Sequence, residues 1–190
     1  MNKRVVITGM GVISPVGNSV NDFRDGIFSG KNGIDKITKF DTEGFRACLA
    51  AEVKDFDVSA YMDKNEARKL DKYSQYAVAA AMQAVADSKI TESVSPERFG
   101  VYFGSGIGGF ETMITEHSKL LDRGPQRVSP MFIPKMIANI AAGNIAIKFG
   151  AKGPCLSIVT ACATGSSCIG EAFRAIKDGY ADAIIAGGAE

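Results

Sequence analysis

Residues 153–170 read GPCLSIVTACATGSSCIG, and this stretch decides the fold. Its first part contains a short apolar run at 156–160, which predicts a buried strand. Small and hydroxyl residues follow, and a helical pattern then extends over 165–179. Cys162 falls in the turn between strand and helix. A strand that leads through a tight turn into a helix is typical of an α/β protein with a parallel sheet.

The remainder of the chain repeats this alternation of strand and helix. Further strands are predicted at 5–8, 100–103 and 183–186, further helices at 19–29, 64–89 and 130–149, and one short strand at 49–53 within the mixed segment 30–57. We therefore predict an α/β fold with helices on both faces of the sheet. A parallel strand needs cover on both faces, so we expect further structure to follow the strand that ends the sequence.

The composition excludes several functional classes. A chain of 190 residues with 46% hydrophobic residues can bury a core, and its net charge of +1 gives no field that would attract nucleic acid or an anionic membrane. Two early positive charges and an apolar run superficially resemble a signal peptide, but Gly9, Gly11 and Pro15 interrupt the run. Since no stretch approaches the length of a membrane span, we expect a cytoplasmic protein with reduced cysteines.

Four cysteines are present, and their positions differ in what they predict. Their irregular spacing, with a single histidine, predicts no metal site. Cys162 would lie at the start of a helix, where backbone N–H groups and the helix dipole stabilise a thiolate and can bind an oxyanion. Thr164, Ser166 and Ser167 are candidate caps for that helix. The remaining cysteines, Cys48, Cys155 and Cys168, are predicted to pack as small hydrophobic residues.

The spacing around Cys162 is similar to the active-site signature of the β-ketoacyl synthases. The pattern is Gly153, four residues, Ile158, two residues, Ala161-Cys162-Ala163-Thr164-Gly165, three residues, Ile169. Three more blocks, at 4–17, 104–109 and 124–130, also resemble that family. Together the four blocks resemble the elongating β-ketoacyl-[acyl carrier protein] synthases of the type II group, and the likeness covers the whole chain.

The resemblance implies the fold, the activity and the partners. Residues 1–190 would be the N-terminal half of a duplicated, layered α-β-α-β-α fold of the thiolase type, with the C-terminal half absent and one apolar face bare. The implied reaction of fatty-acid biosynthesis is a decarboxylative Claisen condensation between an acyl chain on Cys162 and malonyl-[acyl carrier protein]. Two histidines and a lysine of the family's second half take part, so the isolated chain should not condense. No cofactor is implied, and the full-length enzyme would be a homodimer.

The resemblance also assigns roles to residues away from Cys162. Ile107 and Phe132 fall where the family lines its acyl tunnel, although without the resemblance the sequence favours ordinary core packing for them. Lys64, Arg68 and Lys69, with Lys72 nearby, would form a docking surface for the acidic acyl carrier protein, and Arg127 is a weaker candidate for it. Because Glu66 and Asp71 lie among these cations, a solvated mixed-charge helix is the alternative.

Other interpretations remain. The block 104–109 fits the pattern G-x-G-x-x-G, but the acid that a dinucleotide-binding unit needs about twenty residues later is missing. His117 falls on the apolar side of a predicted helix at 110–121, where a packed or boundary histidine with a structural role is expected. Alternative activities are a thiolase or a coenzyme A-dependent starter synthase. A non-catalytic scaffold or chain-length subunit is a further alternative, although such subunits typically replace the cysteine. An inert half-domain that associates with a complementary chain is another.

Overall fold

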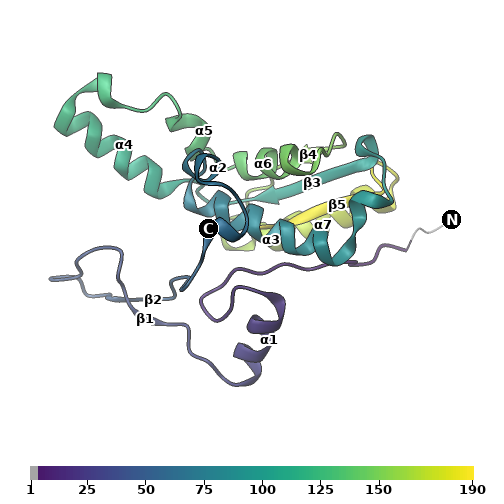
Figure 1. Ribbon diagram of the computed structural model, residues 1–190, viewed down its shortest axis with the longest axis horizontal. Helices are drawn as coiled ribbons and strands as arrows, with labels where there is room; N and C mark the ends of the chain where they lie inside the picture. The colour runs from purple at the N-terminus through teal and green to yellow at the C-terminus, as the bar shows by residue number, and fades with distance from the viewer. Residues whose placement is uncertain (1–3) are drawn as a thin grey trace.

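The computed structural model describes residues 4–190 and contains a three-stranded parallel sheet (Figure 1). The central strand is β3 (Phe99–Gly104), which pairs with β4 (Cys155–Leu156) on one side and with β5 (Ala183–Gly188) on the other. All six residues of β3 are buried, as expected for a parallel strand that is covered on both faces. The predicted α/β class is therefore confirmed.

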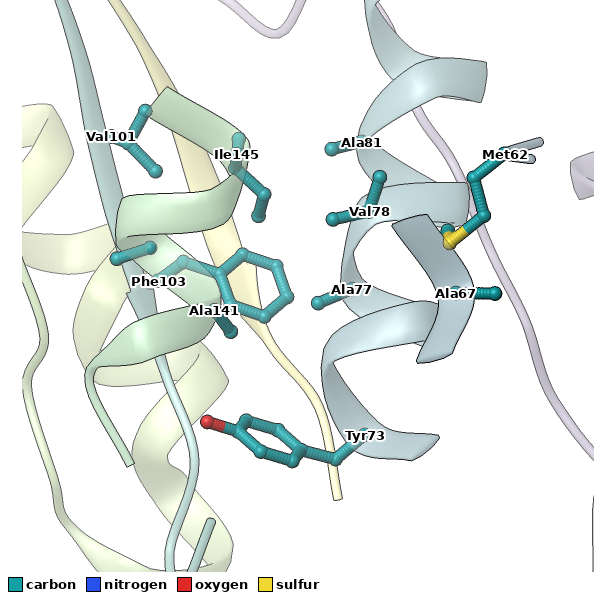
Figure 2. Packing of buried hydrophobic residues seen from close by; sticks show 11 residues of the cluster. Met62, Ala67, Tyr73, Ala77, Val78, Ala81, Val101, Phe103, Ala141 and Ile145 are labelled. Carbon is teal, nitrogen blue, oxygen red and sulfur yellow. The ribbon is translucent and has the colours of Figure 1, made fainter. Parts of the chain in front are cut away.

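Helices cover both faces of the sheet because successive side chains of β3 point in opposite directions. Val101 and Phe103 belong to one buried cluster with α3 (Lys72–Ser88) and α6 (Ile140–Phe149), which Figure 2 shows from close by. Tyr102 belongs to a second cluster with α7 (Thr164–Lys177) on the opposite face. The core thus has two layers that share one strand.

Two predicted long helices are each divided in the structure. The predicted helix 64–89 becomes α2 (Lys64–Arg68) and α3, since Asp63 caps the first and Asp71 caps the second. The predicted helix 130–149 becomes α5 (Phe132–Met136) and α6, since Ile137 adopts an extended conformation between them. Both predictions of a single helix were wrong. By contrast, α1 (Val20–Phe28) and α7 agree with the predicted helices 19–29 and 165–179 within one or two residues.

The predicted strand at 5–8 is also wrong. Within the described part of the chain these residues pair with no strand, and Val6 and Ile7 are 57% and 78% exposed. The segment instead continues along α3 (Figure 1). A Cβ atom on Gly11 would lie 1.8 Å from the carbonyl oxygen of Ala80, so glycine is required for this close approach.

The remaining elements are short or project from the sheet. The strand predicted at 156–160 is restricted to β4, and the expected strand at 49–53 is β2 (Leu49–Ala50), antiparallel to β1 (Asp35–Lys36). An arm made of α4 (Phe110–Arg123) and α5 extends beyond the sheet (Figure 1). Short 3₁₀ helices occupy Val58–Ala60, Ile90–Glu92, Pro96–Arg98, Pro125–Arg127 and Ala161–Ala163.

Candidate active site at the carboxyl end of the sheet

Cys162 lies where the first turn of α7 meets the ends of two strands. It is exposed and sits in the 3₁₀ turn Ala161–Ala163, directly before α7. Glycines at the strand ends allow the helix to come close. A Cβ atom on Gly104 would lie 2.5 Å from Cγ2 of Thr164, and one on Gly188 would lie 3.0 Å from Cα of Gly165. The carboxyl end of a parallel sheet is the usual place for a binding site in α/β proteins.

The backbone at this turn is unusual. Ala161 has a φ of 50°, in the left-handed region that residues with a Cβ atom rarely adopt. Hydrogen bonds around it hold the conformation: the Thr160 N–H donates to Oγ1 of Thr164 at 2.9 Å, and the Ala163 N–H donates to the Thr160 carbonyl at 3.1 Å. The disfavoured backbone conformation of Ala161 is therefore held in place, and it sets the direction in which the chain enters Cys162.

The hydroxyl residues that follow Cys162 do not cap the helix as predicted. The N-cap residue is Ala163, whose methyl group accepts no hydrogen bond. Thr164 instead bonds backwards to Thr160, and the Ser167 hydroxyl shares a 2.7 Å hydrogen bond with the Thr160 hydroxyl. With no side-chain cap at Ala163, the partial positive charge of the helix start is left for a bound anion.

The other three cysteines differ from Cys162 in exposure or position. Cys168 is fully buried against the sheet, and this burial raises the pKa of its thiol, which keeps it protonated and unreactive. Cys48 and Cys155 are exposed, so the prediction that they pack was wrong. They lie beside and within the short strands β2 and β4, where no helix begins. Of the four, Cys162 combines an exposed thiol with a helix start.

The glycine-rich block 104–109 forms a loop that lies against the Cys162 turn. A Cβ atom on Gly106 would be 3.6 Å from Cα of Ala161. At the other end of the loop, Gly108 has a φ of 86° and its N–H donates to Oγ of the buried Ser105 at 2.8 Å. The Gly109 N–H donates to the Met136 carbonyl at 2.8 Å. These N–H groups are engaged internally, which argues against a phosphate-binding loop.

Of the two residues proposed to line an acyl tunnel, Ile107 lies in this loop and Phe132 lies on α5, which the loop contacts through Gly109. Ile107 is at the loop tip and 62% exposed, which argues against core packing. Phe132 is half-buried at the start of α5, the helix whose last residue, Met136, accepts from Gly109. The Gly109–Met136 hydrogen bond thus joins the Ile107 loop to the helix that carries Phe132, and Gly106 of the same loop lies against the Cys162 turn.

The proposed docking cations are exposed at the same end of the molecule. Lys64, Arg68 and Lys69 lie on α2 and its C-cap, and α2 lies near the carboxyl ends of β3 and β5 (Figure 1). Lys72 and Arg127 are also exposed. The two acids that would weaken this patch are otherwise engaged. Glu66 forms a 2.9 Å ion pair with Lys148 of α6.

Asp71 is buried, with one oxygen accepting from Tyr73 and the other from Thr112 of α4. Glu66 is therefore paired and Asp71 is turned inward, but the exposed Asp63 at the N-cap of α2 still interacts electrostatically with Lys69. The cations of α2 face solvent with partial local compensation, and the mixed-charge alternative still applies.

The arm contains a buried charge that sequence reasoning missed. His117 was predicted to be a packed or boundary residue, but it is exposed, and its neighbour Glu116 is the buried residue of α4. The Glu116 carboxylate accepts from Lys119 Nζ at 2.6 Å and from the Ser129 N–H at 2.7 Å. These two interactions lower the pKa of Glu116. The spacing to Lys119 was visible in the sequence, whereas the contact with Ser129 was not.

Among residues 4–190, no group of three or more His, Cys, Asp or Glu side chains is placed to hold a metal ion. The helices of this described part are also too short or too polar to cross a membrane.

Comparison with known proteins identifies the family. The family model described as "Beta-ketoacyl synthase, N-terminal domain" matches residues 2–190. The 3-oxoacyl-[acyl-carrier-protein] synthase 2 of Staphylococcus aureus (strain COL) is 51% identical over 191 residues, which cover 100% of this chain and 46% of that protein. The protein of the same name from Synechocystis sp. (strain ATCC 27184 / PCC 6803 / Kazusa) is 47% identical, with 99% and 45% covered.

A solved structure gives the same result for the fold. The ishigamide ketosynthase/chain length factor superposes with a TM-score of 0.90 at 32% identity, covering 100% of this chain and 48% of that one. The predicted thiolase-like α/β fold is thus confirmed, and the chain spans about half the length of the curated relatives it matches. The chain belongs to the β-ketoacyl synthase family and corresponds to its N-terminal domain.

Proposed function

We propose that this chain provides the acyl-accepting half of a β-ketoacyl-[acyl carrier protein] synthase, an acyltransferase of fatty-acid elongation. The observation that carries the proposal is the exposed Cys162 thiol, held by a left-handed Ala161 at the uncapped start of α7. The names of the relatives, both 3-oxoacyl-[acyl-carrier-protein] synthases, support the substrate class.

The first half-reaction follows from this geometry. The Cys162 thiolate attacks the carbonyl carbon of an acyl thioester, and the negative charge that forms on the oxygen is stabilised by N–H groups at the helix start. The carbon–sulfur bond to the carrier then breaks. The carrier thiolate leaves and takes up a proton, and the acyl group remains on Cys162 as a thioester.

The second half-reaction needs groups beyond Cys162. Loss of carbon dioxide from a malonyl thioester gives a carbanion, which attacks the acyl carbonyl and expels the Cys162 thiolate. The single histidine of the chain, His117, is an exposed residue of α4, and no contact between it and the turn Ala161–Ala163 is found in the described residues. We therefore propose that residues 1–190 form one thiolase-type unit, and that a second unit supplies the histidines and the lysine. Homodimerisation and a cytoplasmic location belong to the same proposal.

Two surfaces would serve the substrates. Ile107 and Phe132 would contact the acyl chain beside Cys162, in keeping with the exposed position of Ile107 and the contact between their segments. The cations Lys64, Arg68 and Lys69 would bind the acidic carrier protein, supported by their exposure and by the engagement of Glu66 and Asp71 elsewhere.

The test is acyl transfer followed by mass spectrometry. Incubation with an acyl-[acyl carrier protein] should add the acyl mass to the peptide that contains Cys162, and Cys162→Ser should lose at least about 99% of the thioester. Cys155→Ser, at an exposed cysteine with no helix start, is the matched control and should retain the transfer. Acylation of Cys48 or Cys155 in place of Cys162 would reject the assignment.

The same assay separates the alternatives. Transfer from acyl coenzyme A that exceeds transfer from the carrier protein would favour a thiolase or a starter synthase. An absence of transfer from both donors, even with a second-half partner, would favour a non-catalytic subunit. Charge reversal at Lys64 and Arg68 should reduce carrier-protein affinity without changing the reaction of Cys162 with a small electrophile.

A further inference from the structure

Glu190 makes a contact that the proposed mechanism does not use. Its carboxylate accepts a hydrogen bond from the backbone N–H of Gly106, in the loop after β3. The parallel register of β3 and β5 brings the two together, because Gly104 pairs with Gly188 and the Ala189 N–H donates to the Gly104 carbonyl at 3.1 Å. The Gly106 N–H is the next donor beyond this ladder. A side-chain carboxylate therefore takes the place of a further backbone acceptor.

The backbone of Gly106 lies between Glu190 and the Cys162 turn. A Cβ atom on Gly106 would be 2.9 Å from Oε1 of Glu190 and 3.6 Å from Cα of Ala161. Ala161 is the left-handed residue that immediately precedes Cys162. The contact with Glu190 consequently acts on a part of the loop that lies against the turn of the proposed nucleophile.

The two ends of the loop are held by different groups. Ser105 and Met136 fix Gly108 and Gly109 at the far end. Glu190 fixes Gly106 at the near end, and Ile107 lies between these anchors. Loss of the Glu190 acceptor would therefore free the near end of the loop, while Ser105 and Met136 still hold the far end.

We propose that Glu190 is a positioning residue, which anchors Gly106 and thereby sets the place of Ile107 beside Cys162. The inference rests on the proposed function, since it concerns the wall that an acyl chain on Cys162 would contact. Glu190 acts through the loop, and the property it needs is a side-chain oxygen that accepts the Gly106 N–H.

The experiment compares Glu190→Ala and Glu190→Gln with the unchanged protein. Cys162 is alkylated with iodoacetamide and, separately, with an iodoacetamide that carries a twelve-carbon chain, and both rates are followed by mass spectrometry. We expect Glu190→Ala to lower the ratio of the long-chain rate to the short-chain rate about fivefold or more, with the short-chain rate changed less than about twofold. Glu190→Gln keeps an acceptor oxygen and should restore the ratio to within about twofold.

Hydrogen exchange provides a second readout on the same proteins. Exchange in the peptide that spans 104–109 should be about tenfold faster in Glu190→Ala and close to unchanged in Glu190→Gln. Glu97→Ala is the matched control, because Glu97 is also exposed but lies before the amino end of β3. It should alter neither the rate ratio nor the exchange of this peptide.

The outcomes separate this inference from the proposed function. A rate ratio and an exchange rate unchanged in Glu190→Ala would overturn the positioning role. A fall in the rate ratio as large in Glu190→Gln as in Glu190→Ala would also overturn it. The charge of Glu190, and not its acceptor oxygen, would then be the property that matters. Failure of both reagents to label Cys162 in the unchanged protein would reject the proposed function, while hydrogen exchange would still test the anchor. If Glu190→Ala does not fold, Glu190→Asp replaces it and should give intermediate values.

Discussion

The body of the molecule and the α4–α5 arm are stabilised in different ways. In the body, β3 is buried by apolar contacts with α3 and α6 on one face (Figure 2) and with α7 on the other. On α4, by contrast, the large apolar side chains are exposed, including Phe110, Met113, Ile114 and Leu121. Polar contacts hold this arm, at Asp71 with Thr112 and at Glu116 with Ser129. Apolar burial fixes the sheet, whereas individual hydrogen bonds fix the arm.

This difference predicts where a substitution should matter most. The apolar face of α4 contributes little to the stability of the described chain, because it is not buried. A change in the body should therefore cost more than an equal change on the arm, and a polar contact that joins the two should fall between them.

The largest effect is expected at the junction of β3 with α7. Gly104→Ala would place a Cβ atom 2.3 Å from the Ile158 carbonyl oxygen and 2.5 Å from Cγ2 of Thr164, so the Cys162 turn must move. We expect a loss of more than about 4 kcal/mol in the free energy of unfolding in urea. Gly170→Ala, within α7 and with no heavy atom within 4 Å of the added Cβ, is the control and should be neutral or slightly stabilising.

The next largest effect compares two isoleucines. Ile145 of α6 is fully buried and Ile114 of α4 is 53% exposed. Replacement of Ile145 by alanine should lower the free energy of unfolding by about 3 kcal/mol, since it removes transfer free energy and leaves a cavity. The same replacement at Ile114 should cost less than about 0.5 kcal/mol. Equal losses in urea unfolding would contradict the distinction between body and arm.

A smaller effect is expected at the polar link between the two regions. Asp71 caps α3 through Tyr73 and accepts from both the N–H and the hydroxyl of Thr112 at the start of α4. Asp71→Ala should therefore cost about 2 kcal/mol, the sum of a lost cap and an unsatisfied buried donor. Asp63→Ala, which removes only the exposed cap of α2, should cost about 1 kcal/mol. If thermal unfolding gives the same loss for both, Asp71 does not link α4 to the body.

The sequence predicted those features that local patterns determine. The strand at 100–103, the helix at 165–179 and the position of Cys162 between strand and helix all depend on neighbouring residues, and they agree with the structure. The division of 64–89 was also encoded locally, in Asp63 and Asp71. The apolar periodicity continues through these residues and therefore predicted a single helix. A capping residue can end one helix and begin another without interrupting the hydrophobic pattern.

Other features depend on contacts between distant residues and were not predictable in this way. The apolar run at 5–8 has strand propensity, but a strand also needs a neighbour that accepts its hydrogen bonds. Propensity likewise says nothing about the exposure of Cys48 and Cys155. The contact between Glu190 and Gly106 arises from the register of β3 with β5, which no local pattern specifies.

The smallest expected effect is a dependence of the arm on pH. Lys119 and the Ser129 N–H lower the pKa of Glu116 below its usual value of 4.5, so the folded arm binds the ionised carboxylate in preference to the acid. The stabilisation is fully present above pH 4.5 and is lost as the pH falls through the lower folded value. Hydrogen exchange around Ser129, corrected for the intrinsic pH dependence, should accelerate in that acidic range.

Glu116→Gln provides the matched comparison, because the amide cannot titrate while its oxygen still accepts from Ser129. Hydrogen exchange around Ser129 should be slightly faster in the variant at neutral pH. It should not accelerate further as the pH is lowered through the range in which Glu116 of the unchanged protein becomes protonated. Exchange in the β3 peptide should not respond in either protein, since apolar burial, which does not titrate, protects that strand. An acid-sensitive β3 combined with an insensitive arm would reverse the comparison, and would place the titrating contact in the body of the molecule.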